Sequence, residues 1–569
     1  MRSVESAVRG LARLYPWSVE ARDSLDRSLG FVGATVSAET VVRAGYGAAL
    51  LLAPLVVLVV AAVPGRLTPV VAGGGMAAIL AVVHLIHSVP GVLATARRTR
   101  ALGEAPSLVS RAVLRMRIAP TAEAAAAFAA ETGRGPLARS LGEHVRRARG
   151  TPRSGFAGFA TEWESWFPAL GRALLLVDAA GTAEAGERER TLDRGLQTVL
   201  DGARDQMATF ASELQGPATG LYAFGVLLPL ALVALLPAAR MAGIAAPLWA
   251  IVALYDLLLP CVLLAASVWL LARRPVTFPP PRIGRSHPDV PDDLWRPLAA
   301  GVGGALAAGA VATVVVAAWT GPIAALGVGT GAGLVVSYRP VKRVRDHVRD
   351  VEAGLADATY HVGRRIESGT AVETAIATAA EEVPAETGAV FADAARRQRQ
   401  LKVGVREAFL GDGGALASAP SARARSMATL LALAAREGRP AGGAVLAMTE
   451  NLSALSTVER EARLEVARVT GTLANTAAVF APLVAGATVA LADGMQFGGR
   501  LAAEGGPGTA GLGLAVGAYV LALAALLTTL STGLGRGLDR SLVGYRVGWA
   551  LLAATATYLT AFLAVGRLV

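Results

Sequence analysis

Nine long apolar segments constrain the fold of this 569-residue chain more than any other feature of its sequence. A helix that crosses a bilayer needs about 20 mostly apolar residues, and a charged side chain at its centre costs about 2.5–3.5 kcal/mol. Segments that meet both conditions run over residues 45–64, 68–89, 217–238, 246–272, 297–319, 321–338, 471–492, 510–533 and 547–567. Only 17% of the residues are charged, against about 25% in soluble domains. We therefore predict an all-α polytopic membrane protein with about nine transmembrane helices.

The basic residues predict how these segments are oriented. If the N-terminus is cytoplasmic, the regions on the cytoplasmic side hold 50 of the 54 Lys and Arg residues, as the positive-inside rule requires. The C-terminus then lies outside the cell (plasma or inner) membrane. This asymmetry explains the net charge of +11 without nucleic acid. The N-terminal residues lack the apolar stretch of a cleaved signal peptide, and Val4, Val8 and Leu11 instead predict an amphipathic helix.

The apolar segments also divide the chain into regions. Two long loops, 90–216 and 339–470, carry 17 basic and 14 acidic residues and 19 basic and 17 acidic residues, respectively. Because these charges nearly cancel and apolar residues recur at helical spacing, we predict two cytoplasmic helical-bundle domains. The other regions are a cytoplasmic amphipathic N-terminal region (1–44), four transmembrane pairs (45–89, 217–272, 297–338 and 471–533), a basic, Pro-rich linker (273–296), and a cytoplasmic loop with a final transmembrane helix (534–569).

Apolar periodicity and helix breakers place the helices of the two loops. In the first loop we expect helices near 105–118, 121–132, 136–149, 168–179 and 189–216. In the second we expect them near 341–366, 370–383, 386–403, 422–437, 441–456 and 457–470. Helix starts are indicated by Ser107, Thr121, Ser368 and Ser421, and Glu459 with Arg463 is expected to form an i,i+4 pair. The last helix of each loop is expected to continue into the next apolar segment.

The order of segments and loops predicts a parallel internal repeat with a period near 250 residues. In each copy, two segments precede a long loop and two follow it. Three pairs of residues share nearly one offset: Pro90 and Pro340, which we expect to end corresponding segments, Glu123 and Glu373, and Pro229 and Pro482.

The motifs of common active sites are missing from the sequence. It has no GxxxxGK[ST] loop for ATP and no HExxH or GxSxG motif. The GPGTAG run at 506–511 matches GxGxxG but leads into an apolar segment without a preceding strand. One cysteine excludes a disulfide framework. We therefore predict a protein that is not an enzyme and has no catalytic, cofactor or metal site; for His84 and His87, helix packing is favoured over metal binding.

Asp256 stands in the middle of an apolar segment, where a charge is expensive and by default functional. It can pair with a polar group of another helix or with backbone freed by Pro260, or it can belong to a proton path. We favour the structural pair, because one acid does not make a relay. Two small-xxx-small pairs, Gly327 with Gly331 and Gly329 with Gly333, predict close helix packing within the chain or in a homodimer.

The amino-acid sequence of the second loop resembles that of a known protein family. ESGTAVETAIATAAEE (367–382) is followed by LLALAAREGRPAGGAVLAMTENL (430–452) and by a charged helix that enters an apolar segment containing a proline. This pattern resembles the type II secretion system F family of membrane platform proteins, whose EG turn matches Glu437-Gly438 here. In the first loop, the corresponding place is taken by Asp178-Ala-Ala-Gly181. Two such domains and about nine segments in one chain look like the archaeal members, which serve the archaellum or adhesion pili.

The resemblance implies an inner-membrane platform that couples a hexameric cytoplasmic secretion ATPase to the assembly or extrusion of pilin-like subunits. Charged residues of the loops are then candidates for the ATPase contact, although solvated faces explain each of them more simply. These candidates are Arg146, Arg147, Glu187, Arg190, Arg364, Arg365, Arg396, Arg397, Arg399 and Glu437.

Two other classes of protein compete with the platform. A secondary transporter built from parallel repeats would have the same order of segments, but nearly half of this chain is cytoplasmic loop and a single acid lies deep in a segment. A membrane signalling or processing enzyme would need a nucleotide or catalytic motif that the sequence lacks. The expected partners are the ATPase, pilin-like subunits, membrane lipid and, if the platform is a homodimer, a second copy of the chain, with no nucleic acid.

Overall fold

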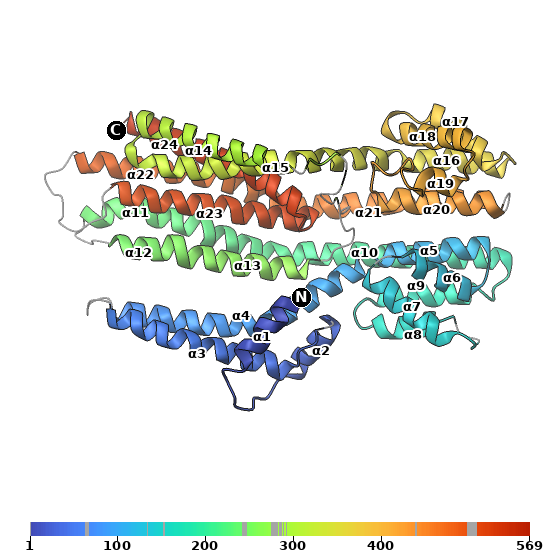
Figure 1. Cartoon of the computed structure of the whole chain (residues 1–569), viewed down its shortest axis with the longest axis horizontal. Coiled ribbons are helices and arrows are strands. Elements are labelled where there is room, and N and C mark those ends of the chain that lie inside the picture. Colours follow the sequence, from blue (N-terminus) through green and yellow to red (C-terminus); the bar gives the residue numbers. More distant parts are fainter. Residues whose placement is uncertain are drawn as a thin grey trace. The chain divides into compact units, whose positions relative to one another are not determined.

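A computed structural model describes residues 2–568, except residues 33, 63–67, 134, 152, 153, 242–246, 275–282, 284–286, 288, 292, 438–440 and 498–508. Over these residues the chain forms helices joined by loops and has no β-strand (Figure 1), which confirms the all-α prediction. It packs as two compact units: Met1–Ala101 with Leu271–Arg274, and Leu102–Leu270 with Pro275–Val569.

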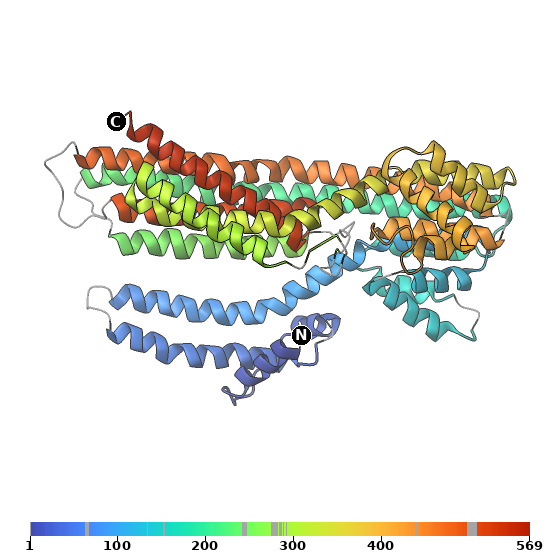
Figure 2. The ribbon, with the colours of Figure 1, turned by 45° about the horizontal axis from the view of Figure 1, so that its top comes forward.

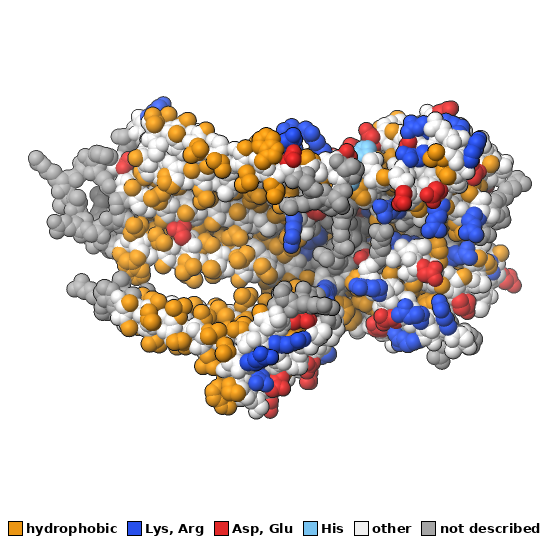
Figure 3. Space-filling model, in the orientation of Figure 1, with side chains coloured by type: hydrophobic (Ala, Val, Ile, Leu, Met, Phe, Trp, Pro, Cys, Tyr) orange, Lys and Arg blue, Asp and Glu red, His pale blue; other side chains and the backbone are white. Residues whose placement is uncertain are grey.

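Nine helices of the described chain are long and apolar enough to cross a membrane. They are Ala38–Ala62, Val71–Thr99, Ala185–Leu235, Leu248–Arg273, Trp295–Val315, Ala318–Glu367, Val445–Gly494, Thr509–Arg536 and Arg540–Gly566. Each coincides with one predicted segment, so the chain has the helices of a multi-pass membrane protein. In Figure 3, apolar side chains cover the long helices of the second unit, and charged side chains gather over its shorter helices.

The first unit contains α1 (Arg2–Ala12), α2 (Asp23–Val32), α3 (Ala38–Ala62) and α4 (Thr68–Leu102). Helix α1 fits the amphipathic helix that the sequence predicts, and it packs on α3. His87 of α4 lies against α3, with Nε2 3.2 Å from the carbonyl oxygen of Val42 and its ring edge-on to Tyr46. This contact fits the packing role expected for the histidine. Helix α2 was not predicted.

The membrane part of the second unit is built on two very long helices. The first runs through α10 (Ala185–Tyr222), η1 (Ala223–Leu227) and α11 (Leu228–Met241). The second runs through α21 (Ala441–Asn475), η4 (Thr476–Phe480) and α22 (Ala481–Phe497). The expected continuity from loop into membrane is therefore confirmed, and 441–456 and 457–470 are one helix instead of two. Figures 1 and 2 show α10 and α21 side by side.

The remaining long helices pack against these two either directly or through one another. In chain order they are α12 (Leu248–Val252), η2 (Ala253–Leu258), α13 (Leu259–Arg273), α14 (Trp295–Val315), η3 (Ala318–Thr320), α15 (Gly321–Ala353), α23 (Thr509–Arg536) and α24 (Arg540–Gly566). Pro90 and Pro340 were expected to end their segments, and this was wrong: both lie inside a helix, α4 and α15. A proline removes only one N–H group from the helix, a cost that the packing of the rest of the helix can exceed.

Glycines of α15 let two other helices approach closely. Gly327 and Gly331 face α23 and α24: a Cβ on Gly331 would lie 2.9 Å from the carbonyl oxygen of Gly548. Gly329 and Gly333 face α14 instead, where a Cβ on Gly329 would lie 2.7 Å from an alanine side chain. The two small-residue pairs therefore serve two different contacts within the chain, as close packing of backbones requires.

Shorter helices form the two charged regions. The first region contains α5 (Ala105–Ile118), α6 (Ala122–Thr132), α7 (Pro136–Ala148), α8 (Phe156–Trp163) and α9 (Pro168–Ala179). The second contains α16 (Leu355–Glu367), α17 (Val372–Glu382), α18 (Ala385–Leu401), α19 (Val405–Leu410) and α20 (Ala422–Glu437). Helices α8 and α19 are too short to show the periodicity that a sequence argument needs.

Two of the four expected helix starts are wrong. Thr121 and Ser421 precede α6 and α20, and the Ser421 hydroxyl accepts the N–H of Ala424 at 3.1 Å. Ser107, however, lies inside α5, because Pro106 lets that helix begin earlier. Ser368 follows the end of α16.

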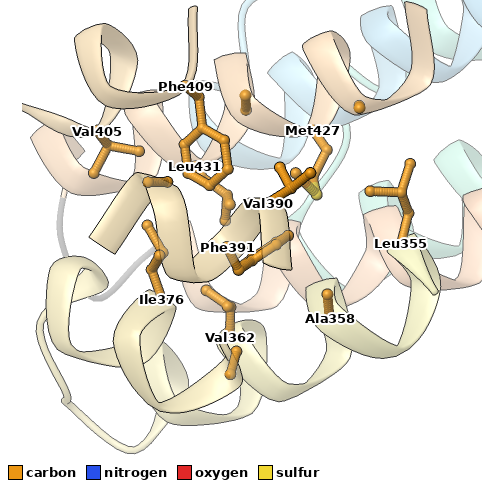
Figure 4. Packing of buried hydrophobic residues seen from close by; sticks show 14 of the residues in the cluster. Leu355, Ala358, Val362, Ile376, Val390, Phe391, Val405, Phe409, Met427 and Leu431 are labelled. Carbon is orange, nitrogen blue, oxygen red and sulfur yellow. The ribbon is translucent and has the colours of Figure 1, made fainter. Parts of the chain in front are cut away.

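A buried apolar core holds the second charged region together. Side chains of α16 to α20 meet there (Figure 4), with the rings of Phe391 and Phe409 5.4 Å apart and nearly perpendicular. This geometry is the favoured one for aromatic pairs. Leu114 of α5 belongs to the same core, so the two charged regions share apolar contacts.

Two pairs of elements in the second unit share their lengths and nearly one offset in the sequence. Helices α6 and α17 both have 11 residues and begin 250 positions apart, at Ala122 and Val372. The π-helical turns η1 and η4 both have five residues and begin 253 positions apart, at Ala223 and Thr476. Each turn is followed two residues later by a proline.

Candidate partner surfaces and intramembrane polar groups

The candidates of the first charged region lie at helix ends. Arg146 and Arg147 occupy the last turn of α7, and Glu187 and Arg190 lie near the start of α10; all four are exposed. The Arg147 Nη2 atom lies 3.4 Å from Nδ1 of His144. Cations at a helix C-terminus and an anion at an N-terminus stabilise the helix through its dipole. This local role is independent of any partner.

In the second region, Arg364 and Arg365 lie in the last turn of α16. Arg364 extends over the ring of Tyr360, with 5.9 Å between the guanidinium carbon and the ring centre. Arg365 pairs with Glu382 of α17 at 2.5 Å, and Nδ1 of His361 lies 2.8 Å from the same carboxylate. Arg365 therefore has a role in joining two helices, whereas Arg364 is exposed.

Three further candidates lie on α18. Arg396 and Arg397 both pair with Asp393, one turn earlier on the same helix, and Arg399 is exposed. Among the described residues, the arginines of α16 and those of α18 share no carboxylate partner. The second region thus carries two basic groups of candidates, one on α16 and one on α18. The side chain of Glu437 and the whole of Gly438, which match the EG turn, lie outside the described residues.

The corresponding turn of the first region is well formed. Helix α9 ends at Ala179, and the N–H of Gly181 donates to the carbonyl of Asp178 at 3.0 Å. The Asp178 carboxylate accepts the hydroxyl of Ser154 at 2.5 Å. This acid therefore fixes the loop before α8.

Two ion-pair networks were not predicted from the sequence. In one, Arg423 of α20 pairs with Glu459 of α21 and lies 3.8 Å from Glu352 of α15, whose carboxylate accepts the Ser421 hydroxyl at 2.6 Å. Glu459 also pairs with Arg463, as predicted. In the other, Arg204 of α10 lies 3.3 Å from Glu461 of α21.

The first network joins α20 of the second charged region to the long helices α15 and α21, and the second joins the long helices α10 and α21. Their partners are 36 to 257 positions apart in the sequence, so the i,i+4 rule reveals only the pair within α21.

Asp256 lies in the π-helical turn η2, half-buried among the membrane helices. Its buried Oδ1 atom has no hydrogen-bond partner within the described residues, so the structural pair predicted for it is not seen there. Its neighbour Tyr255 donates a hydrogen bond to the carbonyl of Pro229 at 2.6 Å and packs edge-on against Tyr519.

Tyr519 of α23 provides a hydrogen-bond donor for a carbonyl group that Pro229 leaves unpaired. Pro229 has no N–H, so the carbonyl of Gly225, four residues earlier, lacks its usual helical partner. The Tyr519 hydroxyl donates to that carbonyl. Sequence reasoning missed both tyrosines, because a tyrosine in an apolar segment is unremarkable until its partner is known.

The fold and these sites define a class: an all-helical, multi-pass membrane protein with two charged helical regions joined to its bundle by continuous helices. Searches of protein-family models, curated proteins and solved structures return no match to this chain.

Proposed function

We propose that this protein is the membrane platform of a type IV pilus-like, archaellum or type II secretion-like machine. Its part is to couple a cytoplasmic secretion ATPase to the assembly or extrusion of pilin-like subunits, without being an enzyme itself. The observation that carries the proposal is the pair of helices Ala185–Leu235 and Val445–Gly494, which run without interruption from a charged helical region into the membrane bundle. Such a helix is a stiff link between a soluble partner and the bilayer.

The proposal includes a tandem repeat, which supports membership of the F family with two copies of its domain. The matched lengths and starts of α6 and α17 support it, as do the two π-helical turns that precede prolines at one offset. The turns adjoin Pro229 and Pro482, so they extend the correspondence between these two prolines to two structural elements.

We place the protein in the plasma or inner membrane with a cytoplasmic N-terminus and an external C-terminus, from the distribution of its basic residues. Single cysteines at Arg190 and at Arg567, introduced after Cys261→Ser, test this orientation in intact cells. An impermeant maleimide is expected to label only the cysteine at 567. Labelling at 190 alone would reverse the orientation.

Co-purification with the secretion ATPase tests the function. The double variant Arg396→Glu with Arg397→Glu reverses one basic face of the second region and is expected to abolish ATPase capture from detergent extracts. The matched control, Arg406→Glu with Arg425→Glu, reverses two exposed arginines of the same region. Equal capture by both variants would remove the α18 arginines from the contact, and no capture by the wild-type chain would contradict the platform function.

One observation favours a transporter instead: the Oδ1 atom of Asp256 lies inside the bundle with no hydrogen-bond partner among the residues that the structure describes. An intramembrane acid of this kind marks transport pathways in many membrane proteins. Asp256→Asn separates the alternatives. Loss of filament assembly at normal protein levels supports a functional role within the platform, low protein levels support a structural role, and intact filaments with altered solute uptake would favour the transporter.

A further inference from the structure

Five arginines meet where the long helices of the second unit leave their apolar stretches. Arg345 and Arg349 lie one turn apart on α15, Arg463 lies on α21, Arg536 ends α23, and Arg546 lies on α24. Packing of α15 on α24, of α21 on α23 and of α23 on α24 brings these residues into one neighbourhood, where Arg536 is repelled by the other four. Such a gathering of cations is unfavourable unless anions are near.

Carboxylates of the chain balance only part of this charge. Arg345 is 3% exposed and pairs with Asp539 at 2.6 Å between Nη2 and Oδ2. Its buried Nε has no hydrogen-bond partner within the described chain. Burial alone would raise the pKa of Asp539, but hydrogen bonds from Ser541 and Leu542 and the charge of Arg345 together lower it, so this acid stays ionised.

The other four arginines divide into two pairs. Arg349 lies 3.8 Å from Asp346, and Arg463 pairs with Glu459. Arg536 and Arg546 pair with no carboxylate among the residues that the structure describes. The cluster therefore keeps two arginines whose guanidinium donors remain available to an anion from outside the chain.

Apolar side chains lie next to these two arginines. The connection between α23 and α24 carries Leu538, which is 58% exposed, and Trp549 lies one turn beyond Arg546 on α24 and is 53% exposed. Tryptophan is enriched at the level of lipid headgroups. Free phosphate would use the arginines alone, whereas a phospholipid would use the arginines and the apolar surface that continues into the membrane.

We propose that Arg536 and Arg546, backed by the buried Arg345–Asp539 pair, bind the phosphate of an anionic phospholipid, whose acyl chains lie along the apolar faces of α23 and α24. Basic pockets between transmembrane helices on the cytoplasmic side are known to bind such headgroups. Guanidinium groups suit phosphate because they offer parallel N–H donors. The inference does not depend on the platform function.

Native mass spectrometry of the full-length chain tests the site. The probes are phosphatidylglycerol and phosphatidylcholine with identical acyl chains, mixed in equal amounts with detergent. The wild-type chain is expected to retain phosphatidylglycerol preferentially. Arg536→Gln with Arg546→Gln should lower that preference by about fivefold for each arginine removed, from the typical attraction of one basic side chain to an anionic membrane surface.

Two matched variants keep the result interpretable. Arg343→Gln with Arg468→Gln removes the same charge from exposed positions on α15 and α21 and should leave the preference unchanged. Arg536→Lys with Arg546→Lys keeps the charge and should retain most of the preference, which separates lost binding from misfolding. An unchanged preference in the glutamine variant, or no preference in the wild-type chain, would overturn the proposal.

Two further outcomes would assign the arginines to other anions. Binding of inorganic phosphate that the glutamine variant abolishes, with an unchanged lipid preference, would identify a site for free anions. Loss of a co-purifying cytoplasmic protein with an unchanged lipid preference would identify a protein contact. Either result would overturn the lipid assignment.

Discussion

Asp539 has two roles: it caps the N-terminus of α24 and it pairs with the buried Arg345. Replacement by asparagine tests these roles separately. Its Oδ1 atom accepts the N–H groups of Ser541 at 2.9 Å and Leu542 at 3.1 Å, which caps the N-terminus of α24. Its Oδ2 atom lies 2.6 Å from Nη2 of the buried Arg345. Asp539→Asn keeps an oxygen for the cap, because asparagine caps helices as well as aspartate does. It also leaves the guanidinium of Arg345 buried without its counter-charge.

The structure sets the size of the effect. Removing one partner of a fully buried ion pair costs about 3–5 kcal/mol. The Asp539 side chain is 18% exposed, so water relieves part of this cost and we expect about 2–3 kcal/mol. Asp539→Ala should cost about 1 kcal/mol more, since it also removes the cap. Combining Asp539→Asn with Arg345→Met should cost less than the two separate changes together, because no unpaired charge remains.

Hydrogen exchange measured by mass spectrometry on the detergent-solubilised chain gives the local stability directly. Amides at the start of α24 should exchange roughly 30- to 150-fold faster in Asp539→Asn, the rate change that corresponds to about 2–3 kcal/mol. Peptides from α17 should be unaffected. Asp357→Asn serves as the control, because Asp357 lies exposed in the first turn of α16.

The pH dependence provides a second check. A carboxyl whose pKa is lowered by folding stabilises the native state above its unfolded pKa, and this contribution is lost as the pH falls through the folded value. The pKa of Asp539 is lowered, so wild type and Asp539→Asn should converge as the pH falls below about 4. Unchanged exchange in the asparagine variant at neutral pH would refute the argument that Arg345 depends on this partner.

Three other changes test the packing. Phe391→Ala removes a fully buried ring and should destabilise the second charged region by about 3–5 kcal/mol, seen as rapid proteolysis between α16 and α20; slow cleavage would contradict the core assignment. Gly331→Ala should destabilise the helical bundle by about 1–3 kcal/mol, which is measured as a lower melting temperature in detergent. Gly303 has open space around it, so Gly303→Ala should leave the melting temperature unchanged. Tyr519→Phe should cost about 1–3 kcal/mol by leaving a buried carbonyl unpaired, and less when Pro229→Ala restores the N–H; equal losses in both backgrounds would exclude that pairing.

Helices with local boundary markers were predictable from the sequence. Helix α9 extends over residues 168–179, as expected, because a proline opens it and the apolar periodicity ends with it. Helix α5 has the expected range of 105–118, although Pro106 and not Ser107 lies at its start. The same reasoning failed at Pro90 and Pro340, which lie inside α4 and α15. A proline removes one hydrogen bond, and a local rule cannot weigh that loss against the packing of the rest of a long helix.

The candidate sites were predictable only where the interacting residues belong to one helix or where a single residue stands out from its segment. The Glu459–Arg463 pair and the isolated Asp256 follow from spacing and hydropathy. Arg345 and Asp539 are 194 positions apart in the sequence, and their pairing depends on how α15 packs against α24. The contact between Tyr519 and the carbonyl of Gly225 spans 294 positions. No local pattern distinguishes such residues from others of the same type, so their roles emerged only from the folded chain.

The two π-helical turns show where the long helices are least uniform. In each of the two long helices, a proline interrupts the hydrogen-bond ladder about a dozen residues inside the apolar segment, and bends in helices concentrate at such points. In the first helix, the Tyr519 hydroxyl donates to the carbonyl of Gly225 that Pro229 leaves free. In the second helix, Pro482 removes the N–H donor four residues after the carbonyl of Ala478. There η4 packs against α23 and α24, so neighbouring helices hold this turn in place.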